Sequence, residues 1–112
     1  IKFMLQPLVE NAIYHGAACR KTGGKIVIGA VKKESCIIIF VWDNGDGFAP
    51  EQYKRYKEFF GKKEITGVSF QDKSEKIGLI NVHTRLKFTF GEEAGLFLWQ
   101  ENGTAVCIRL PD

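Results

Sequence analysis

The stretch that most constrains the fold of this 112-residue chain is the apolar run 36–42 together with the turn that follows it. The run is rich in β-branched residues and free of proline, which is typical of a buried β-strand. Asp43 follows directly at the end of the predicted strand, and Gly45 and Gly47 come after it at alternate positions. A carboxylate at a rigid strand end, beside glycines that let a backbone approach a ligand closely, can accept a hydrogen bond from a ligand amine. Residues 43–47 also fit a simple tight turn, because Asn-Gly and Asp-Gly are common turn dipeptides.

Length and composition indicate one globular domain. The chain is 45% hydrophobic and has nine Phe, which is enough for a core. Its formal net charge of +3 does not indicate nucleic acid as a partner. The three cysteines, Cys19, Cys36 and Cys107, form no Cys-x-x-Cys pattern, so we expect reduced cysteines rather than a disulfide or a zinc site. No apolar run is long enough to cross a bilayer, and a first residue of Ile suggests part of a longer protein.

Apolar residues recur at helical spacing in 5–16, after Ala49-Pro50, and in 77–90. In the first of these stretches, Asn11 and His15 lie four residues apart and therefore share one face of the predicted helix. An Asn and a His are also ordinary residues for the solvated face of an amphipathic helix, so this pair alone does not establish a site.

Short apolar runs at 26–31, 96–100 and 105–110 predict three further strands. A short polar connection joins the first of them to the strand at 36–42, and a Gly-containing turn joins the last two, so we expect two hairpins. Alternation along the last strand turns its even-numbered residues toward the helices and Arg109 away from them.

Residues 61–76 show no sustained periodicity and contain several lysines. A loop of this length in a compact domain is usually functional. Its lysines suit phosphate, although a solvated linker would look much the same. Gly78 stands where the next helix begins, and a helix N-terminus with glycine at its mouth is suited to anions. Arg85 follows seven residues later, on the same face of that helix.

Three separated motifs stand in one order: Gln6-Pro7-Leu8-Val9-Glu10-Asn11-Ala12, Asp43-Asn44-Gly45-Asp46-Gly47-Phe48 and Ile77-Gly78-Leu79-Ile80-Asn81-Val82. With Arg85-Leu86, Gly91 and Gly103-Thr104 they resemble the catalytic ATP-binding domain of sensor histidine kinases. The wider group includes DNA gyrase, heat-shock chaperone and mismatch-repair ATPases, which share the Bergerat fold.

The resemblance covers nearly the whole chain. It implies a catalytic domain over residues 1–112, with residues 61–76 as the ATP lid. The implied fold is a two-layer α/β sandwich, in which three helices cover one face of a mixed, mostly antiparallel sheet.

The resemblance also implies a nucleotide site. Asn11 would be the Mg²⁺ ligand, and Asp43 would accept a hydrogen bond from the adenine amino group. Thr104 would lie behind the adenine, beside Asp43. The glycines of the 43–47 turn would let the chain pass close to the base, and the start of the helix at 77–90 would offer backbone N–H groups to the phosphates. The residues implied are Asn11, His15, Asp43, Gly45, Gly47, Gly78, Leu79, Arg85 and Thr104.

The implied activity is protein histidine kinase: binding MgATP and donating the γ-phosphate to a histidine on an adjoining dimerisation domain upstream. The phosphohistidine would supply an aspartate of a response regulator, as in two-component signalling. The full-length protein would be a homodimer anchored in the bacterial cell membrane, with this domain in the cytoplasm. The chain's two histidines, His15 and His83, are not assigned as the phosphoacceptor.

The chain departs from the family pattern at three positions. Tyr14 replaces a phosphate-binding Lys found in many histidine kinases, and Lys76 precedes a glycine box that is usually richer in glycine. Pro7 stands where the ATPase relatives carry the Glu that activates water, and Glu10 lies elsewhere on the helix. Two alternatives remain at this point: an ATPase or serine kinase of the same fold, and a degenerate nucleotide-binding interaction module without phosphotransfer.

Overall fold

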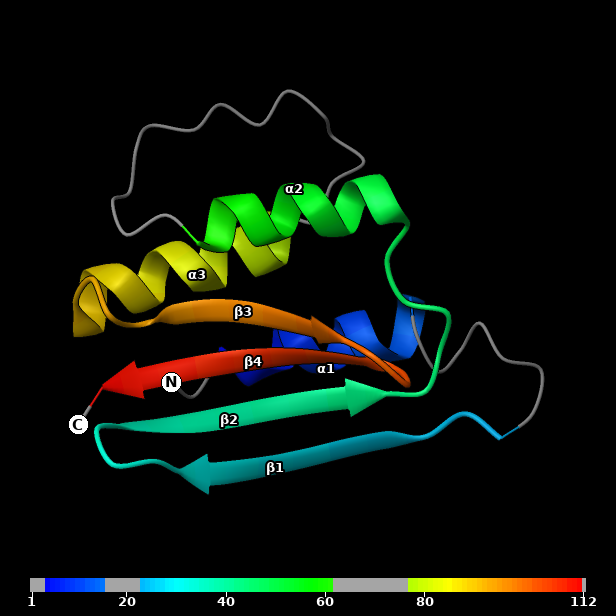
Figure 1. Ribbon diagram of the computed structural model, residues 1–112, viewed down its shortest axis with the longest axis horizontal. Helices are drawn as coiled ribbons and strands as arrows, with labels where there is room; N and C mark the ends of the chain where they lie inside the picture. The colour runs from blue at the N-terminus through cyan, green and yellow to red at the C-terminus, as the bar shows by residue number, and fades with distance from the viewer. Residues whose placement is uncertain (1–3, 16–22, 62–76, 112) are drawn as a thin grey trace.

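The computed structural model describes residues 4–15, 23–61 and 77–111 of the chain. In chain order its elements are α1 (Leu5–His15), β1 (Ile26–Lys32), β2 (Cys36–Asp43), α2 (Pro50–Phe60), α3 (Ile77–Phe90), β3 (Gly95–Gln100) and β4 (Thr104–Pro111). The strands form one layer and the helices another, and in Figure 1 the strands pass in front of α1.

The sheet has the order β1-β2-β4-β3, so its two central strands come from opposite halves of the chain. β2 and β4 run antiparallel in a register that sets Asp43 opposite Thr104. The hairpin between β3 and β4 depends on Gly103, whose φ is +110°. A Cβ there would lie 2.5 Å from the carbonyl oxygen of Asp43, so only glycine fits where this turn crosses the end of β2.

The core lies between the sheet and the helices. α1 packs on β2, α3 on β3 and β4, and α2 on β3. The side chains that are buried most completely are Leu8, Val41, Leu79, Val82, Leu86, Val106 and Ile108. In α2, Tyr56 stacks on Phe60 with ring centroids 5.5 Å apart, so the aromatic spacing in this helix serves packing.

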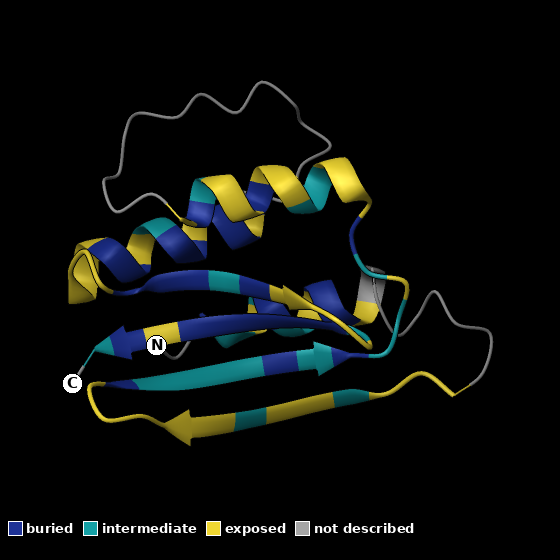
Figure 2. Ribbon diagram, viewed as in Figure 1, coloured by how far each residue is buried: buried dark blue, intermediate teal, exposed yellow. Residues whose placement is uncertain are grey.

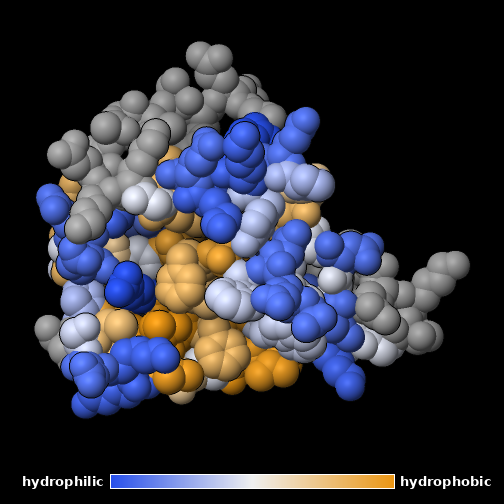
Figure 3. Space-filling model, viewed as in Figure 1, coloured by the Kyte–Doolittle hydropathy of each residue, from blue (hydrophilic) through white to orange (hydrophobic). Residues whose placement is uncertain are grey.

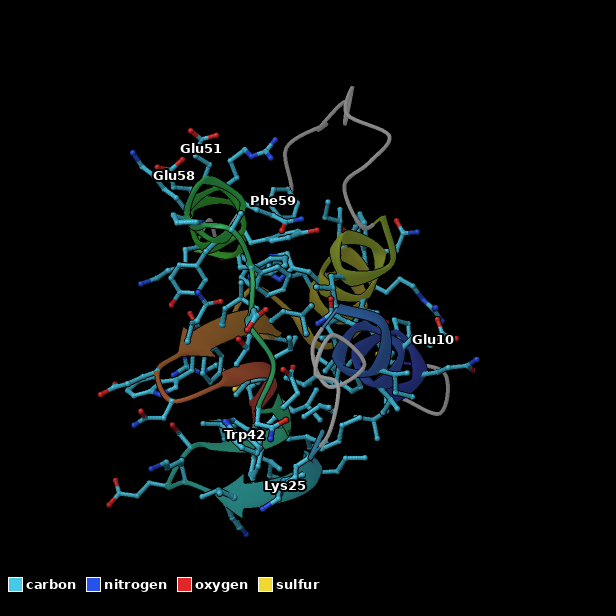
Figure 4. All side chains as sticks on the ribbon, turned by 90° about the vertical axis from the view of Figure 1, so that its right-hand side faces the viewer. Glu10, Lys25, Trp42, Glu51, Glu58 and Phe59 are labelled. Carbon is cyan, nitrogen blue, oxygen red and sulfur yellow. The ribbon has the colours of Figure 1, made fainter. Side chains whose placement is uncertain are left out.

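The other side of the sheet carries no helix among the described residues, as Figure 4 shows from the end of the strands. We call this side the open sheet face. Its strand residues alternate with the core residues. They are Val27, Gly29, Val31, Cys36, Ile38, Phe40, Trp42, Gly95, Phe97, Trp99, Ala105, Cys107, Arg109 and Pro111. Figure 2 shows that exposure on the sheet is greatest along the edge strand β1.

The predicted two-layer α/β sandwich is confirmed, and each predicted helix and strand lies within one residue of its expected bounds. The three strand pairs of the described residues are all antiparallel, so the parallel pair that a mixed sheet would contain is not among them. Of the expected lid, residues 61–76, only Gly61 is described, and it ends α2. In the described part of the chain every helix is too short or too polar to cross a bilayer.

Candidate functional site

The apolar strand β2 carries Asp43 into the interior at its last position. Although it is charged, Asp43 is only 3% exposed, because the strand end lies beneath α1 and beside β4. The N–H of Gly45 donates to Asp43 Oδ1 over 2.9 Å. This short-range bond turns the chain away from the strand while leaving the carboxylate inside.

Asn44 fixes the same turn from the other side. Its Nδ2 donates to the carbonyl oxygen of Gly23 over 2.8 Å, and its Oδ1 accepts from the Lys25 N–H over 2.9 Å. These bonds tie the segment before β1 to the end of β2. The chain bends at Gly45, and the side chain of Asn44 has a structural part in holding that bend.

Gly47 brings the backbone of the turn close to the side chains of Gln100 and Thr104. Its φ is +80°, and a Cβ at this position would lie 2.6 Å from both Gln100 Oε1 and Thr104 Oγ1. Gln100 holds the turn on the sheet: its Oε1 accepts from the Phe48 N–H over 3.0 Å and from the Thr104 hydroxyl over 3.4 Å. The sequence prediction missed Gln100. Its position opposite Thr104 across the predicted hairpin was the available signal.

These elements bring distant residues together. Asn11 from α1, Asp43 from β2 and Thr104 from β4 line one small cavity with Gly47 and Phe48. The cavity measures about 10 Å³, which is the space of one water molecule. All three polar side chains are buried. The sequence prediction named the polar members and Gly47, and it quoted Phe48 only as part of a motif.

The other predicted site residues lie along α3 or at the end of α1. Gly78 is exposed at the start of α3, and a Cβ there would lie 3.6 Å from Cβ of Pro7, so α3 begins beside α1. Arg85 is exposed, about 10 Å further along the helix axis. Leu79 is a core residue, so only its backbone remains for a ligand. The side chain of His15 lies outside what the structure describes.

Glu10 does not point toward this site. It is exposed, and its Oε1 accepts a hydrogen bond from Gln6 Nε2 over 3.0 Å. Figure 4 shows Glu10 on the side of α1 that faces away from the sheet. The ring of Pro7, one turn earlier, offers no proton acceptor. Neither residue can serve as a base beside the cavity.

A metal at this end of the sheet would have few protein ligands. The described residues contain no group of three or more His, Cys, Asp and Glu that could hold a metal ion. The amide oxygen of Asn11 is a hard oxygen donor of the kind that Mg²⁺ accepts, and Mg²⁺ often keeps waters and ligand phosphates as its remaining partners. The donor set therefore fits a magnesium ion that arrives with a phosphate ligand.

His83 stands at the opposite end of the sheet and is structural. It is 3% exposed, and its Nδ1 accepts from the Leu96 N–H over 2.9 Å. The ring of Phe60 lies 4.8 Å from the imidazole, centroid to centroid. Burial, followed by the charge of Lys87, lowers the pKa of His83 to about 4, so this imidazole is neutral at pH 7.

The cysteines that the structure describes agree with the sequence prediction. Cys36 and Cys107 are buried and free. Burial raises the pKa of the Cys107 thiol to about 11, which makes it a poor nucleophile at neutral pH. Cys19 lies outside the described residues.

Comparison with known proteins gives a consistent result. The family described as "Histidine kinase-, DNA gyrase B-, and HSP90-like ATPase" matches residues 1–112. The sensor histidine kinase YpdA of Escherichia coli (strain K12) is 36% identical over 110 residues, which are 97% of this chain and 17% of that protein. The chain therefore spans about a sixth of the length of this relative.

Solved structures show the same fold. The catalytic domain of the histidine kinase ThkA superposes with a TM-score of 0.67 at 22% identity, covering 98% of this chain and 65% of that one. ThkA in complex with the response regulator protein TrrA superposes with a TM-score of 0.63 at 22% identity, covering 98% of this chain and 28% of that one. At such identities the likeness concerns the fold alone.

Proposed function

Since this chain belongs to the family of histidine kinase-, DNA gyrase B-, and HSP90-like ATPases, we propose that it binds MgATP and donates the γ-phosphate to a histidine on an adjoining domain. The observation that carries the proposal is the buried carboxylate of Asp43 beside the glycine turn. A carboxylate held at the end of a rigid strand and oriented by the Gly45 N–H is placed to accept a hydrogen bond from a ligand amine.

The proposed base site has Asp43 as its centre. The carboxylate accepts a hydrogen bond from the adenine amino group. The water-sized cavity between Asp43 and Thr104 lets the Thr104 hydroxyl contact the base through a water molecule. Gly45 and Gly47 carry no side chain and would let the base approach the backbone. Because the cavity holds only about one water, the base itself would lie at its mouth, and the 45–48 turn would have to move outward to admit it.

The proposed phosphate site runs from α1 to the start of α3. Asn11 would hold Mg²⁺, which bridges to phosphate oxygens. The N–H groups of Gly78 and Leu79 are among the first of α3, where no partner exists within the helix. Arg85 and His15 would add positive charge or hydrogen bonds, and residues 61–76 would close over the nucleotide as a lid. The protein's contribution to transfer would be positioning and charge neutralisation.

The phosphoacceptor would lie on an upstream dimerisation domain, and the phosphohistidine would then supply the aspartate of a response regulator in a two-component system. The likeness to ThkA, which has been solved in complex with TrrA, supports a regulator as partner. The homodimer and the membrane anchor that the sequence resemblance implies remain part of this proposal. Burial of His83 supports an acceptor outside the described residues, because this imidazole cannot receive a phosphoryl group without leaving the core.

The alternative of a same-fold ATPase is disfavoured by the outward direction of Glu10 and by Pro7. A nucleotide-binding module without phosphotransfer is the second candidate. The small volume of the cavity favours it, because a site that must open to admit a base would bind nucleotide weakly.

The base site is tested by calorimetry on Asp43→Asn, which keeps the shape and an acceptor for the Gly45 N–H. The amide would face the adenine amino group with a donor, so ATP affinity should fall about ten- to a hundredfold. GTP should bind poorly to the native chain, because the oxygen on its six-membered ring faces a carboxylate. Asp46→Asn is the matched control, since Asp46 is exposed in the same turn. Equal ATP and GTP affinities would contradict the assignment.

Transfer is tested on the full-length protein with labelled ATP. Acid-labile protein label, lost when the upstream histidine is replaced, is the result expected of a histidine kinase. Nucleotide binding without any label would favour the module that lacks phosphotransfer.

A further inference from the structure

The open sheet face is more apolar than a solvated surface needs to be. Both tryptophans of the chain, Trp42 and Trp99, are on it. Trp99 is 59% exposed, and Val27 and Val31 on the edge strand are 48% and 44% exposed. Figure 3 shows apolar residues gathered across this face of the molecule. A continuous exposed patch of this kind usually marks an interaction site.

The aromatic side chains of the face form a layer over the sheet. Phe40 and Phe97 flank the small, buried Cys107 in one row of the sheet. On the side of β1, a Cβ on Gly29 would lie 2.5 Å from the ring of Phe40, so this glycine makes room for the ring to lie across the strand. The rings thus cover the backbone with a broad apolar surface, which suits packing against another element of structure.

The charge on the face is a single cation. Among the strand residues of the open sheet face, Arg109 is the only charged one. Its row neighbours are Ile38 and Gly95. A cavity of about 410 Å³ opens beside Arg109 and is lined by Ile38, Phe97 and Phe60. This cavity can take a large apolar side chain next to the guanidinium.

Among the described residues that line this cavity, the acids are Glu92 and Glu93, from the loop between α3 and β3. They lie at its loop side, whereas Arg109 lies at its sheet side. Lys87 also lines the cavity on the loop side, where its Nζ donates to the carbonyl oxygens of Glu92 and Ala94. On the sheet side a ligand carboxylate meets Arg109 without an acid of the strands beside it.

We propose that the open sheet face binds an amphipathic α-helix of a partner polypeptide that carries a carboxylate opposite Arg109. An amphipathic helix presents one apolar stripe with charged residues beside it, which matches an apolar face that carries one cation. A second copy of the chain fits less well, because two open faces stacked together would bring two arginines and no strand carboxylate. A lipid surface is bound by a cluster of basic residues, whereas the strands of this face carry a single basic residue, Arg109.

The test uses two synthetic amphipathic helices, each with leucines at helical spacing. The two peptides differ at one position beside the leucine stripe, which is glutamate in one and lysine in the other. Tryptophan fluorescence reports binding, since both tryptophans lie on the face. The glutamate peptide should bind the native chain about five- to tenfold more tightly than the lysine peptide, and Arg109→Glu should reverse the order.

A matched pair of variants on β1 locates the surface. Val31→Glu places an acid on the open sheet face and should weaken binding of the glutamate peptide at least about tenfold. Ile28→Glu places the same acid on the same strand but on the opposite face, where Ile28 is 55% exposed, and should leave binding unchanged. Both variants are first checked for a native melting temperature.

Several outcomes overturn the proposal. One is the absence of binding by either peptide. Another is equal binding of both peptides that Arg109→Glu does not alter, which would mean non-specific contact with apolar surface. A third is a concentration-dependent dimer in sedimentation that Val31→Glu abolishes, which would make a second copy the occupant.

Discussion

The neutral imidazole of His83 makes the stability of this domain depend on pH in a defined window. In the folded chain Nδ1 of His83 accepts the Leu96 N–H, and a protonated ring would lose that acceptor beside the charge of Lys87. The folded pKa, about 4, is below the ordinary value of 6.5. As the pH falls below 6.5, His83 binds a proton in the unfolded chain but stays neutral in the folded chain. The stabilisation is therefore complete above about pH 6.5 and is lost progressively down to about pH 4.

The magnitude follows from the difference between 6.5 and about 4, which is about 2.5. At about 1.4 kcal/mol per pKa unit, this corresponds to about 3 kcal/mol of unfolding free energy. His83 is 3% exposed, so solvent screening does little to reduce it. Such a loss is a large share of the stability of a domain of this size.

The assay is urea unfolding followed by tryptophan fluorescence for the native chain and for His83→Asn. Asparagine can present an acceptor near the position of Nδ1 and does not titrate. The stability difference between the two proteins should shrink by about 2–3 kcal/mol between about pH 7 and about pH 4.5. Taking the difference removes the carboxylate titrations that both proteins share. If the native chain and His83→Asn gave parallel profiles, the lowered pKa of His83 would be refuted.

Further predictions concern the turn, the metal, the C-terminal end of α3 and the 112-residue chain by itself. Gly47→Ala places a Cβ 2.6 Å from Thr104 Oγ1 at a φ of +80°, so ATP affinity by calorimetry should fall at least about tenfold. Asn11→Ala should weaken ATP binding more with Mg²⁺ than with EDTA, and equal losses would leave Asn11 a structural role only. Lys87→Met removes the donor to the Ala94 carbonyl and should lower the unfolding free energy by about 1–3 kcal/mol in urea, with a rise in the pKa of His83 by NMR titration. The 112-residue chain alone should bind MgATP but release no phosphate and acquire no label, and turnover abolished by Glu10→Gln would indicate an ATPase instead.

The sequence predicted the elements well because each has a local cause. The helix at Leu5–His15 and the helix at Ile77–Phe90 bury one stripe of apolar residues, and that stripe is visible as spacing along the chain. The strand at Cys36–Asp43 is apolar on both faces. One side meets the core, and the other side belongs to the apolar open sheet face. Its continuous apolar run is therefore explained by its central position in the sheet.

Long-range pairing explains what the sequence did not predict. Nothing local to β2 indicates that β4, from the far end of the chain, is its neighbour in the sheet. The part played by Gln100 depends on this register, because it acts only once β3 and β4 lie beside the turn after Asp43. Asn44 likewise looks like an ordinary turn residue until Gly23 is placed beside it.

The contacts at the two ends of α3 link the stability of the fold to the proposed site. Near its C-terminal end, the Nζ of Lys87 donates to the carbonyl oxygens of Glu92 and Ala94 over 2.7 and 2.9 Å. His83, one turn earlier, joins the helix to β3 through Leu96. These bonds fix the direction of α3 at the end that is remote from the small cavity beside Asp43. The helix is rigid over its 14 residues, so they also fix where its first N–H groups point. The buried polar residues far from Asp43 therefore orient the helix N-terminus that the proposed function assigns to the phosphates.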